Sequence, residues 1–372
     1  MSEDARWMEV ALQEARRALG PCHPNPAVGA VIVENGQVVA RGHTQAPGGA
    51  HAEVEAIHAW RARPAAGDPV AATLYVTLEP CCTHGRTPPC TDAILRAGLR
   101  RVVVGATDPN PRHAGRGLAL LREAGIEVEV GVLAERCAAL NPVFEHWMRA
   151  GRALIAGKIA TTLDGRIATR TGHSRWITGV GARQDVARWR RAFPAIAVGA
   201  GTLCADDPAL TARVEGEPVW CPRRLVFDRA GRALNRPEAR VFSDQWAEQT
   251  VYVTAPAFAA RVPAAWRARG VEVWDDVLTW EILRARLLEC GLTGLYVEGG
   301  AGLLSDLLRA RELDYLFAYR GAQWLGDVAA PGPFAGFETP TMDGAWRLEA
   351  PQHASFGSDQ LFHGRVVYPP VS

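Results

Sequence analysis

The first 150 residues alternate between helical and extended hydrophobic patterns. Near the start of the chain, apolar side chains recur at the spacing of one helix face, at Met8, Leu12, Ala15 and Leu19. The pair Gly20-Pro21 ends this predicted helix. Apolar runs over 27–33 and 38–40 flank Asn35-Gly36, a sequence typical of a tight turn, and together they predict a β-hairpin.

The same alternation continues beyond the hairpin. Helices are expected near His51, after Cys90 and over 117–123, and strands are expected over 74–78, 101–105 and 126–130. A helical segment over 133–152 then leads into a linker. Helices and strands in this order predict a three-layer α/β/α sandwich.

A second alternating series begins at Ala153, which places a domain boundary near residue 150. Its strands are expected over 154–160, 195–199, 224–227, 250–253, 271–274, 295–297 and 315–319. Its helices are expected over 181–192, 278–290 and 301–310, with an antiparallel edge strand over 359–368. The chain is therefore predicted to hold two α/β domains, residues 1–150 and 151–372.

Composition narrows the class of protein. The chain has 372 residues, of which 48% are hydrophobic and 22% charged, so a disordered or coiled-coil protein is disfavoured. It lacks the roughly 18 consecutive apolar residues of a membrane span, and its start is acidic where a signal peptide is basic, so we expect a cytoplasmic protein without a membrane partner. A formal net charge of +1 also argues against a nucleic-acid partner. A small-molecule substrate is the better expectation.

One set of residues in the first domain has the chemistry of a catalytic zinc site. His51 and Cys90 stand at predicted helix starts, and Cys81 follows a predicted strand. One histidine and two thiolates leave a fourth tetrahedral position open, as in catalytic zinc sites. Glu53, two residues after His51, can shuttle the proton of a water molecule whose pKa the metal lowers to roughly 7. Cys82 is left outside the ligand set, because adjacent side chains rarely bind one tetrahedral ion.

The second domain contains two features that indicate cofactor chemistry. Lys158 is the single lysine of the chain and lies in a predicted apolar strand. A functional need for a compact ammonium explains a lysine there better than a structural role does. The run 298–302, Glu-Gly-Gly-Ala-Gly, joins a predicted strand to a helix. Glycines at such a junction let the backbone approach a pyrophosphate. The run is not the G-x-G-x-x-G fingerprint, so a generic Rossmann dehydrogenase is disfavoured.

Both halves also resemble one known family. The motifs that carry the resemblance are His-Pro-Asn-Pro at 23–26, His-Ala-Glu at 51–53, Leu-Glu-Pro-Cys at 78–81, the Gly-Arg-Thr-Pro-Pro-Cys run at 85–90 and the segments around 158, 174–178, 205–213 and 298–302. They resemble the bifunctional deaminase/reductase family of riboflavin biosynthesis. The resemblance implies a cytidine-deaminase-like domain followed by a dihydrofolate-reductase-like domain. It also implies a phosphoribosylaminopyrimidine substrate, one zinc ion and NADPH, and we expect a homo-oligomer formed through the reductase domain.

The resemblance assigns roles to individual positions. It implies Glu53 and Lys158 as catalytic residues and His51, Cys81 and Cys90 as zinc ligands. The implied substrate contacts are Asn25, Arg86, Ser174, Arg190, Leu210, Arg213 and Glu298. The implied NADPH contacts are Ala160, Trp176, Thr202, Asp206, Gly300, Ala301, Gly302, Leu303, Leu304, Ser305 and Asp306.

Three positions depart from the family pattern. Thr44 and Thr83 replace histidines, each with a histidine as its neighbour in sequence, and Arg229 replaces a small polar residue near the cofactor phosphate. The threonines leave open a changed pyrimidine substrate, as in a related or deazaflavin-like pathway, or a weakened deaminase. Two further alternatives remain: a tRNA-editing type of deaminase, which the neutral charge and the eight residues between Cys81 and Cys90 disfavour, and a non-catalytic zinc-binding scaffold.

Overall fold

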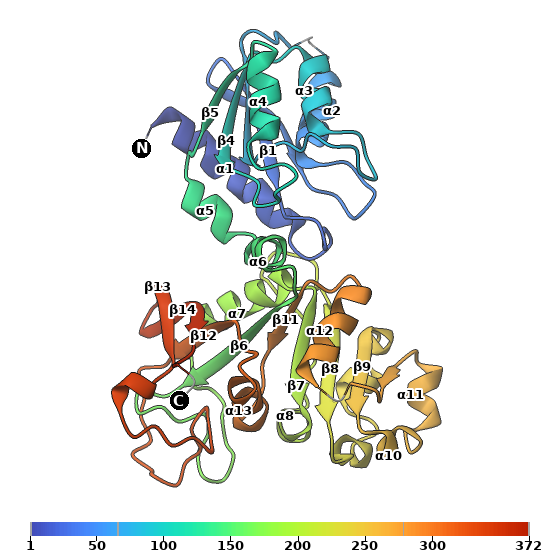
Figure 1. Ribbon diagram of the computed structural model, residues 1–372, viewed down its shortest axis with the longest axis vertical. Coiled ribbons are helices and arrows are strands. Elements are labelled where there is room, and N and C mark those ends of the chain that lie inside the picture. Colours follow the sequence, from blue (N-terminus) through green and yellow to red (C-terminus); the bar gives the residue numbers. More distant parts are fainter. Residues whose placement is uncertain (1, 65–66, 278, 371–372) are drawn as a thin grey trace. The chain divides into compact units, whose positions relative to one another are not determined.

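The computed structural model describes residues 2–64, 67–277 and 279–370, and the chain divides into two compact units, Met1–Gly151 and Arg152–Ser372 (Figure 1). Each unit contains a sheet of its own, five-stranded in the first and nine-stranded in the second. Among the described residues, no helix combines the length and the apolar character that crossing a bilayer requires.

The first unit is built on a sheet with the strand order β2-β1-β3-β4-β5. Its strands are β1 (Gly29–Glu34), β2 (Gln37–His43), β3 (Ala72–Leu78), β4 (Arg101–Ala106) and β5 (Glu127–Val130). Its helices are α1 (Glu3–Ala18), α2 (Ala52–Arg61), α3 (Cys90–Ala97), α4 (Arg116–Glu123), α5 (Ala134–Ala139) and α6 (Pro142–Ala150). Strand β1 pairs antiparallel with β2 and β3, whereas β3, β4 and β5 are parallel. The predicted α/β class is confirmed.

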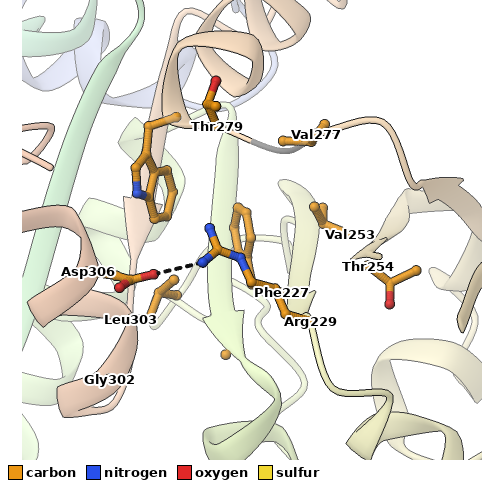
Figure 2. A pocket seen from close by; sticks show the side chains of 11 residues that line it. Phe227, Arg229, Val253, Thr254, Val277, Thr279, Gly302, Leu303 and Asp306 are labelled. Carbon is orange, nitrogen blue, oxygen red and sulfur yellow. Dashed lines mark hydrogen bonds and ion pairs between the residues drawn. The ribbon is translucent and has the colours of Figure 1, made fainter. Parts of the chain in front are cut away.

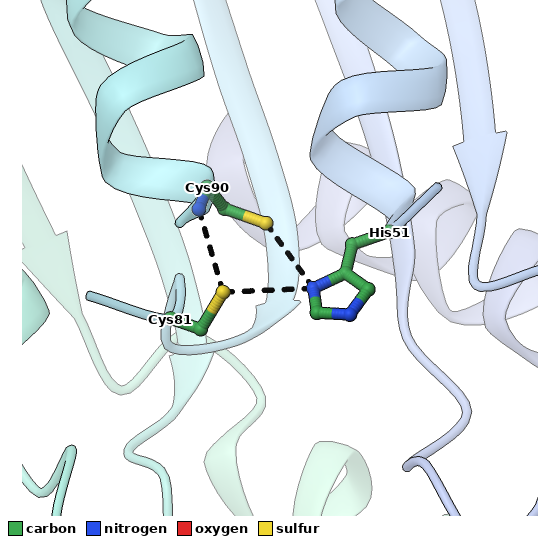
Figure 3. Close-up of side chains that lie close together, drawn as sticks. All are labelled: His51, Cys81 and Cys90. Atoms are coloured by element: carbon green, nitrogen blue, oxygen red, sulfur yellow. Dashed lines mark hydrogen bonds between the residues drawn. The ribbon is translucent and has the colours of Figure 1, made fainter. Parts of the chain in front are cut away.

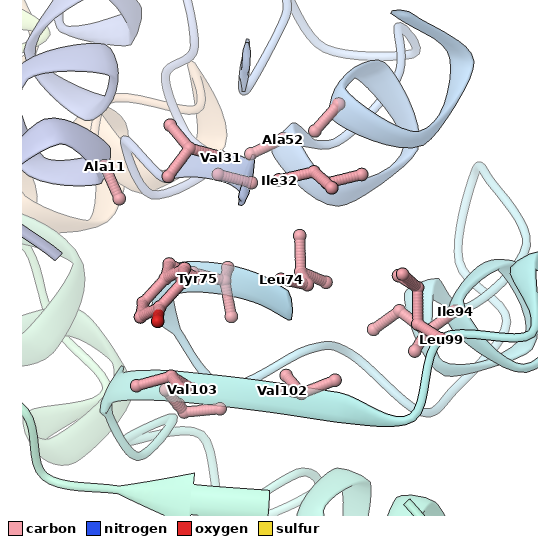
Figure 4. Close-up of a cluster of buried hydrophobic side chains, with 14 of the residues drawn as sticks. Ala11, Val31, Ile32, Ala52, Leu74, Tyr75, Ile94, Leu99, Val102 and Val103 are labelled. Atoms are coloured by element: carbon pink, nitrogen blue, oxygen red, sulfur yellow. The ribbon is translucent and has the colours of Figure 1, made fainter. Parts of the chain in front are cut away.

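Helices pack closely on both faces of this sheet. A Cβ added at Gly29 would overlap the backbone of α1 at Ala11 and Ala15, and one added at Gly42 would overlap α2. Because glycine has no side chain, these two positions let a helix approach each face of the sheet. Figure 4 shows apolar side chains of the neighbouring strands β1, β3 and β4, together with Ala11 of α1, Ala52 of α2 and Ile94 of α3.

The predicted hairpin is confirmed down to its turn. Asn35 and Gly36 connect β1 to β2 with φ values of 49° and 71°. Two successive residues with positive φ match the right-handed twist of the flanking strands, which is why Asn-Gly is favoured there.

The expected helical segment over 133–152 is divided into α5 and α6. Asn141 lies between the two helices, and its side-chain amide exchanges two hydrogen bonds with the backbone of Ala27. Pro142 then begins α6, where its missing N–H is tolerated. A long-range contact and a proline together therefore interrupt what the hydrophobic pattern presents as one helix.

The second unit is built on a sheet with the strand order β10-β9-β8-β7-β11-β6-β12-β14-β13. Its strands are β6 (Leu154–Thr161), β7 (Ala195–Gly199), β8 (Arg223–Asp228), β9 (Thr250–Thr254), β10 (Glu272–Trp274), β11 (Gly294–Val297), β12 (Tyr315–Arg320), β13 (Arg347–Phe356) and β14 (Asp359–Val367). Strands β6 to β12 pair in parallel, β14 pairs antiparallel with β12, and β13 pairs antiparallel with β14. The carboxyl ends of the parallel strands meet at one edge, where open α/β sheets bind ligands.

The helices of this unit are α7 (Val180–Ala192), α8 (Ala200–Asp206), α9 (Arg240–Ser243), α10 (Pro256–Ala259), α11 (Ala264–Ala268), α12 (Trp280–Glu289) and α13 (Ala301–Arg309). Short 3-10 turns occupy Arg232–Asn235, Ala247–Gln249 and Met342–Gly344. The helix predicted over 278–290 is α12, and residue 278 lies outside the described residues.

One strand assignment needs correction. The segment predicted as an edge strand over 359–368 is antiparallel, as expected, but β14 lies between β12 and β13. The edge strand on this side of the sheet is β13, which the hydrophobic pattern did not reveal. Most of its residues are exposed, and its register shifts between Glu349 and Gln352, so it lacks the alternation of a half-buried strand.

Candidate functional site

The first unit brings His51, Cys81 and Cys90 together, although they are 39 residues apart in sequence at most. The His51 Nδ1 atom lies 3.5 Å from the Cys81 Sγ atom and 3.3 Å from the Cys90 Sγ atom (Figure 3). All three ligand atoms lie within 4.8 Å of one another. One imidazole nitrogen and two sulfur atoms at this separation fit a tetrahedral zinc ion that retains one open position.

Secondary structure sets the positions of these three side chains. His51 is the N-cap residue of α2, Cys90 is the first residue of α3, and Cys81 follows the end of β3. The backbone N–H of Cys90 donates a hydrogen bond to the Cys81 Sγ atom at 3.4 Å. The start of α3 thus supplies one ligand and a donor to a second, and the positive end of a helix dipole favours thiolates.

Glu53 lies in the first turn of α2 with 3% of its surface exposed. Burial, reinforced by the nearby Cys81 sulfur, raises the pKa of its carboxyl to about 7. A carboxyl group with such a pKa can both accept and donate a proton near neutral pH. Its position two residues from His51 therefore suits proton transfer at the open side of the metal site.

The loop beside this cluster is held by Glu79, a residue to which sequence reasoning assigned no role. Its buried carboxylate accepts hydrogen bonds from the backbone N–H groups of Asp108, Gly115 and Gly117, at 2.9–3.1 Å. Hydrogen bonds to an ionised acceptor are stronger than neutral ones, so this carboxylate fixes the path of residues 108–117. The sequence signal was present, because Glu79 directly precedes Pro80-Cys81 in the motif itself.

The 108–117 loop also carries a histidine that the sequence did not single out. The His113 Nε2 atom lies 3.5 Å from the Thr83 hydroxyl, and its Nδ1 atom lies 3.7 Å from the Cys82 Sγ atom. An imidazole thus stands beside Thr83, one of the two threonines that depart from the family pattern.

The other departing threonine directly follows β2. Thr44 is buried, and its hydroxyl accepts a hydrogen bond from the backbone N–H of Val28 at 3.2 Å. Its neighbour His43 has its Nδ1 atom 3.9 Å from a carboxylate oxygen of Glu14 on α1. The adjacent Gly42 faces α2, so His43 points to the opposite face of the sheet from the helix that His51 begins.

The remaining candidates of the first unit lie outside this ligand cluster. Asn25 is half-buried in the loop that precedes β1, and Arg86 is exposed in the loop between Cys81 and Cys90. Cys82 faces His113.

In the second unit, the candidates surround a cavity of about 1100 Å³ at the carboxyl ends of β6, β7 and β11. The predicted site residues that line it are Lys158, Ala160, Ser174, Trp176, Arg190, Thr202, Asp206, Leu210, Arg213, Glu298, Gly300, Ala301, Gly302, Leu303 and Leu304. Six arginines line it as well: Arg175, Arg183, Arg190, Arg213, Arg232 and Arg240. A cavity this rich in guanidinium groups suits phosphorylated ligands.

A charged triad stands in the wall of this cavity. Arg190 donates two hydrogen bonds to the Glu298 carboxylate, the one from Nη2 at 2.9 Å, and the Lys158 Nζ atom lies 3.8 Å from the same carboxylate. Burial alone raises the pKa of Glu298, but Arg190 and Lys158 hold it below its ordinary value. Burial lowers the pKa of Lys158, and Glu298 opposes that shift in part.

The glycines of this cavity leave room for a ligand against the backbone. A Cβ added at Gly201 or Gly302 would meet no atom within 4 Å, although both residues line the cavity. The backbone N–H of Gly300, the N-cap residue of α13, donates a hydrogen bond to the Thr202 hydroxyl at 3.1 Å. The start of α13 therefore presents open backbone to the cavity, as a pyrophosphate requires.

Two predicted cofactor contacts lie elsewhere. Asp306 lines a second, smaller cavity, where it pairs with Arg229 (Figure 2). Ser305 is buried and accepts a hydrogen bond from the backbone N–H of Ala335, and it lines neither of these two cavities.

Comparisons with known proteins relate each unit to a described domain family. Residues 1–106 match the cytidine and deoxycytidylate deaminase zinc-binding region, and residues 153–362 match the RibD C-terminal domain. The riboflavin biosynthesis protein RibD of Bacillus amyloliquefaciens is 38% identical over 358 residues, which is 95% of this chain and 94% of that protein. RibD of Escherichia coli strain K12 is 37% identical, over 88% of this chain and 90% of that protein.

Solved structures extend this similarity to the whole chain. Acinetobacter baumannii RibD superimposes with a TM-score of 0.78 at 33% identity, over 98% of this chain and 99% of that one. A diaminohydroxyphosphoribosylaminopyrimidine deaminase/5-amino-6-(5-phosphoribosylamino)uracil reductase from Thermotoga maritima reaches 0.80 at 33% identity, over 98% of each chain. The two domains match in the same order along the chain, and the identity to RibD proteins extends over nearly the whole sequence. This protein therefore belongs to the RibD family of riboflavin biosynthesis.

Proposed function

We propose that this chain deaminates 2,5-diamino-6-ribosylamino-4(3H)-pyrimidinone 5′-phosphate in its first unit and reduces the ribosyl group of the product in its second. The observation that carries this proposal is the presence on one chain of a His-Cys-Cys cluster beside a buried glutamate and of a guanidinium-rich cavity with a half-buried lysine. Zinc and NADPH, the cofactors of the family, fit these two groups of residues.

In the deamination, the chain holds the metal and moves a proton. His51, Cys81 and Cys90 would hold the zinc ion, which when bound supplies a Lewis acid that makes water nucleophilic at neutral pH. The Glu53 carboxylate would accept a proton from the attacking water and deliver it to the departing amino group. Glu79 and the 108–117 loop would keep the surroundings of Cys82 and Thr83 in place.

In the reduction, the chain binds the sugar phosphate and polarises the sugar oxygen. NADPH, when bound, supplies the hydride for C1 of the ribosyl group. The Lys158 ammonium would polarise or protonate the sugar oxygen, while Glu298, held by Arg190, keeps that ammonium in place. The arginines that line the cavity would hold the 5′-phosphate.

One experiment tests both halves. Zinc-loaded protein is mixed with the diaminopyrimidinone substrate and NADPH, and ammonia and the loss of nicotinamide absorbance are followed together. Equal amounts of both signals are expected. Glu53→Gln should suppress ammonia release by roughly 10²–10⁴-fold and still oxidise NADPH when deaminated substrate is supplied. Ammonia release at the wild-type rate by Glu53→Gln would contradict the assignment.

We also propose that copies of the chain associate through the reductase unit. The edge strand β13 is largely exposed, and the neighbouring β14 exposes Phe362 and Val367 at 42% and 44%. Exposed strand edges and apolar side chains favour association. Light scattering on the purified protein should therefore give a mass of two or more times 40.2 kDa, and a mass of 40.2 kDa would contradict association. The cytoplasmic location stays a prediction.

A further inference from the structure

Arg224 of β8 is a fully buried arginine that has no part in the reaction proposed above. Its exposed fraction is 0%, and it lines neither the large cavity nor the smaller one. Its guanidinium forms a two-point ion pair with Asp244, from Nη1 to Oδ2 at 2.8 Å and from Nη2 to Oδ1 at 2.9 Å. It also donates hydrogen bonds to the Thr250 hydroxyl and to the carbonyl oxygens of Val241 and Trp246. These partners hold the planar guanidinium in one orientation.

The fifth partner of Arg224 belongs to the wall of the large cavity. The Arg224 Nη1 atom donates a hydrogen bond to the Ala209 carbonyl at 3.1 Å, and Ala209, Leu210 and Thr211 all line this cavity. Leu210 has a φ of 55°, a left-handed conformation that residues other than glycine adopt only where their surroundings impose it. On its other side, the Arg190 Nη1 atom donates to the Thr211 carbonyl at 3.0 Å. Two arginines therefore hold the carbonyl groups on either side of Leu210.

The Ala209 carbonyl and the backbone N–H of Leu210 belong to one trans peptide unit, in which the two groups point in opposite directions. Because Arg224 holds the carbonyl behind the cavity wall, the N–H is directed toward the cavity. In the described part of the chain, no group accepts a hydrogen bond from this N–H, although Leu210 is only 1% exposed. A buried backbone donor without a partner is rare and costly, which indicates that a ligand accepts from it.

The surroundings of this N–H favour an anionic oxygen as the acceptor. Arg213 follows in the same loop, is exposed and lines the same cavity. A guanidinium beside an open backbone N–H suits a phosphate group. The substrate proposed for this cavity carries its negative charge on a 5′-phosphate, so the inference rests on the proposed function.

We propose that Arg224 is a positioning residue for substrate binding. By holding the Ala209 carbonyl behind the cavity wall, it directs the Leu210 N–H at the 5′-phosphate of the substrate. Arg224 contacts neither the phosphate nor the carbon that is reduced. It therefore affects the affinity for the substrate and not the hydride transfer.

Arg224→Lys tests this role, because one ammonium cannot hold Asp244 and the Ala209 carbonyl together as the fork of a guanidinium does. Isothermal titration of the full chain with ribose 5-phosphate measures the phosphate contact without any reaction. The variant should bind this probe roughly ten- to a hundredfold more weakly than wild-type protein, the value of one hydrogen bond to a charged group. With deaminated substrate and NADPH, KM should rise in the same proportion while kcat stays near the wild-type value. A fall in kcat at unchanged KM would overturn the proposal.

Thr250→Val is the matched control for the stability of the buried network. It removes the partner of the Arg224 Nε atom but leaves the bond to the Ala209 carbonyl in place. This variant should melt at a lower temperature than wild-type protein and bind ribose 5-phosphate with the wild-type Kd. If it bound the probe as weakly as Arg224→Lys, general loosening of the network would explain both results, and the proposal would be wrong.

A second pair of variants acts from the cavity side and keeps the test decisive even if Arg224→Lys does not fold. Leu210→Pro removes the N–H and cannot adopt a positive φ, whereas Leu210→Gly removes the same side chain but keeps both. Leu210→Gly should therefore bind ribose 5-phosphate far more tightly than Leu210→Pro, and equal binding by the two would overturn the proposal. If wild-type protein and Arg224→Lys bind the probe equally, the inference fails and the reductase assignment stands. If wild-type protein neither binds the probe nor reduces deaminated substrate, both fail.

Discussion

At the scale of single residues, three charged side chains lie close together in the wall of the reductase cavity, largely shielded from solvent. Lys158, Arg190 and Glu298 expose only 20%, 19% and 11% of their side chains. Burying an isolated charge is costly, and the two cations share one carboxylate here, so removing Glu298 would leave two cations without a compensating charge. Such an arrangement holds an ammonium in a fixed place, which is useful for polarising a bound sugar.

The lysine should be required as a lysine. Lys158→Met should lower NADPH oxidation by roughly 10²–10⁴-fold, because the proton donor is lost. Lys158→Arg keeps the charge, but a guanidinium spreads it and stays protonated, so this variant should also be slow. Both variants should release ammonia from the diamino substrate at the wild-type rate. Loss of ammonia release in either one would contradict independent sites.

The pH dependence of the reduction should reflect the lowered pKa of Lys158. Because the ammonium form is needed and burial lowers the pKa, the rate with deaminated substrate should fall on the alkaline side at a pH below the ordinary lysine value of about 10.4. Glu298 raises that pKa, so Glu298→Gln should move the alkaline limb to still lower pH. A pH profile of kcat for both proteins measures this. An unchanged limb, or one moved upward, would contradict the role of Glu298.

The chemical role of a residue could be predicted only where a motif of neighbouring residues indicates it. His51, Glu53, Cys81 and Cys90 were identified because residue type and spacing together indicate one kind of metal chemistry. Glu79 lies within the Leu-Glu-Pro-Cys motif, but neither its loop-holding role nor that of His113 could be assigned, since their partners lie about 30 residues away and only folding brings them together.

At the scale of elements, the 108–117 loop is the part of the deaminase unit most dependent on one side chain. Glu79→Gln replaces a carboxylate that accepts three backbone hydrogen bonds by an amide whose NH₂ group cannot accept. The expected cost in unfolding free energy is about 3 kcal/mol, with faster hydrogen exchange over 108–117 and slower ammonia release.

The control for this change is Glu123→Gln, which alters an exposed glutamate at the end of α4 in the same unit. It should leave exchange over 108–117 and ammonia release at wild-type levels. NADPH oxidation by Glu79→Gln with deaminated substrate should also be unchanged. Wild-type exchange in Glu79→Gln would show that the loop does not depend on this carboxylate.

Elements were predictable where one hydrophobic face is buried. The parallel strands of both sheets were found to within two residues, because their apolar runs are nearly continuous. The exposed strand β13 was missed, and the division of α5 from α6 depends on a contact between Asn141 and Ala27 that no local pattern contains. Sequence periodicity reports burial, so it does not detect elements that are exposed or set by distant partners.

At the scale of the whole molecule, each unit has its own sheet and its own hydrophobic cluster. All three candidate zinc ligands belong to the first unit, and the Lys158 cavity belongs to the second. Separate cores mean that loss of the metal need not disturb the reductase fold.

Removal of zinc should therefore separate the two activities. Protein treated with a chelator should release no detectable ammonia and should oxidise NADPH at the wild-type rate with deaminated substrate, and added zinc should restore ammonia release. Two adjacent cysteines give the matched pair: Cys81→Ser should lose zinc as measured by elemental analysis, whereas Cys82→Ser, whose sulfur faces His113, should retain it. If chelation stopped both reactions, the reductase would depend on the metal site, and two independent sites would no longer describe the chain.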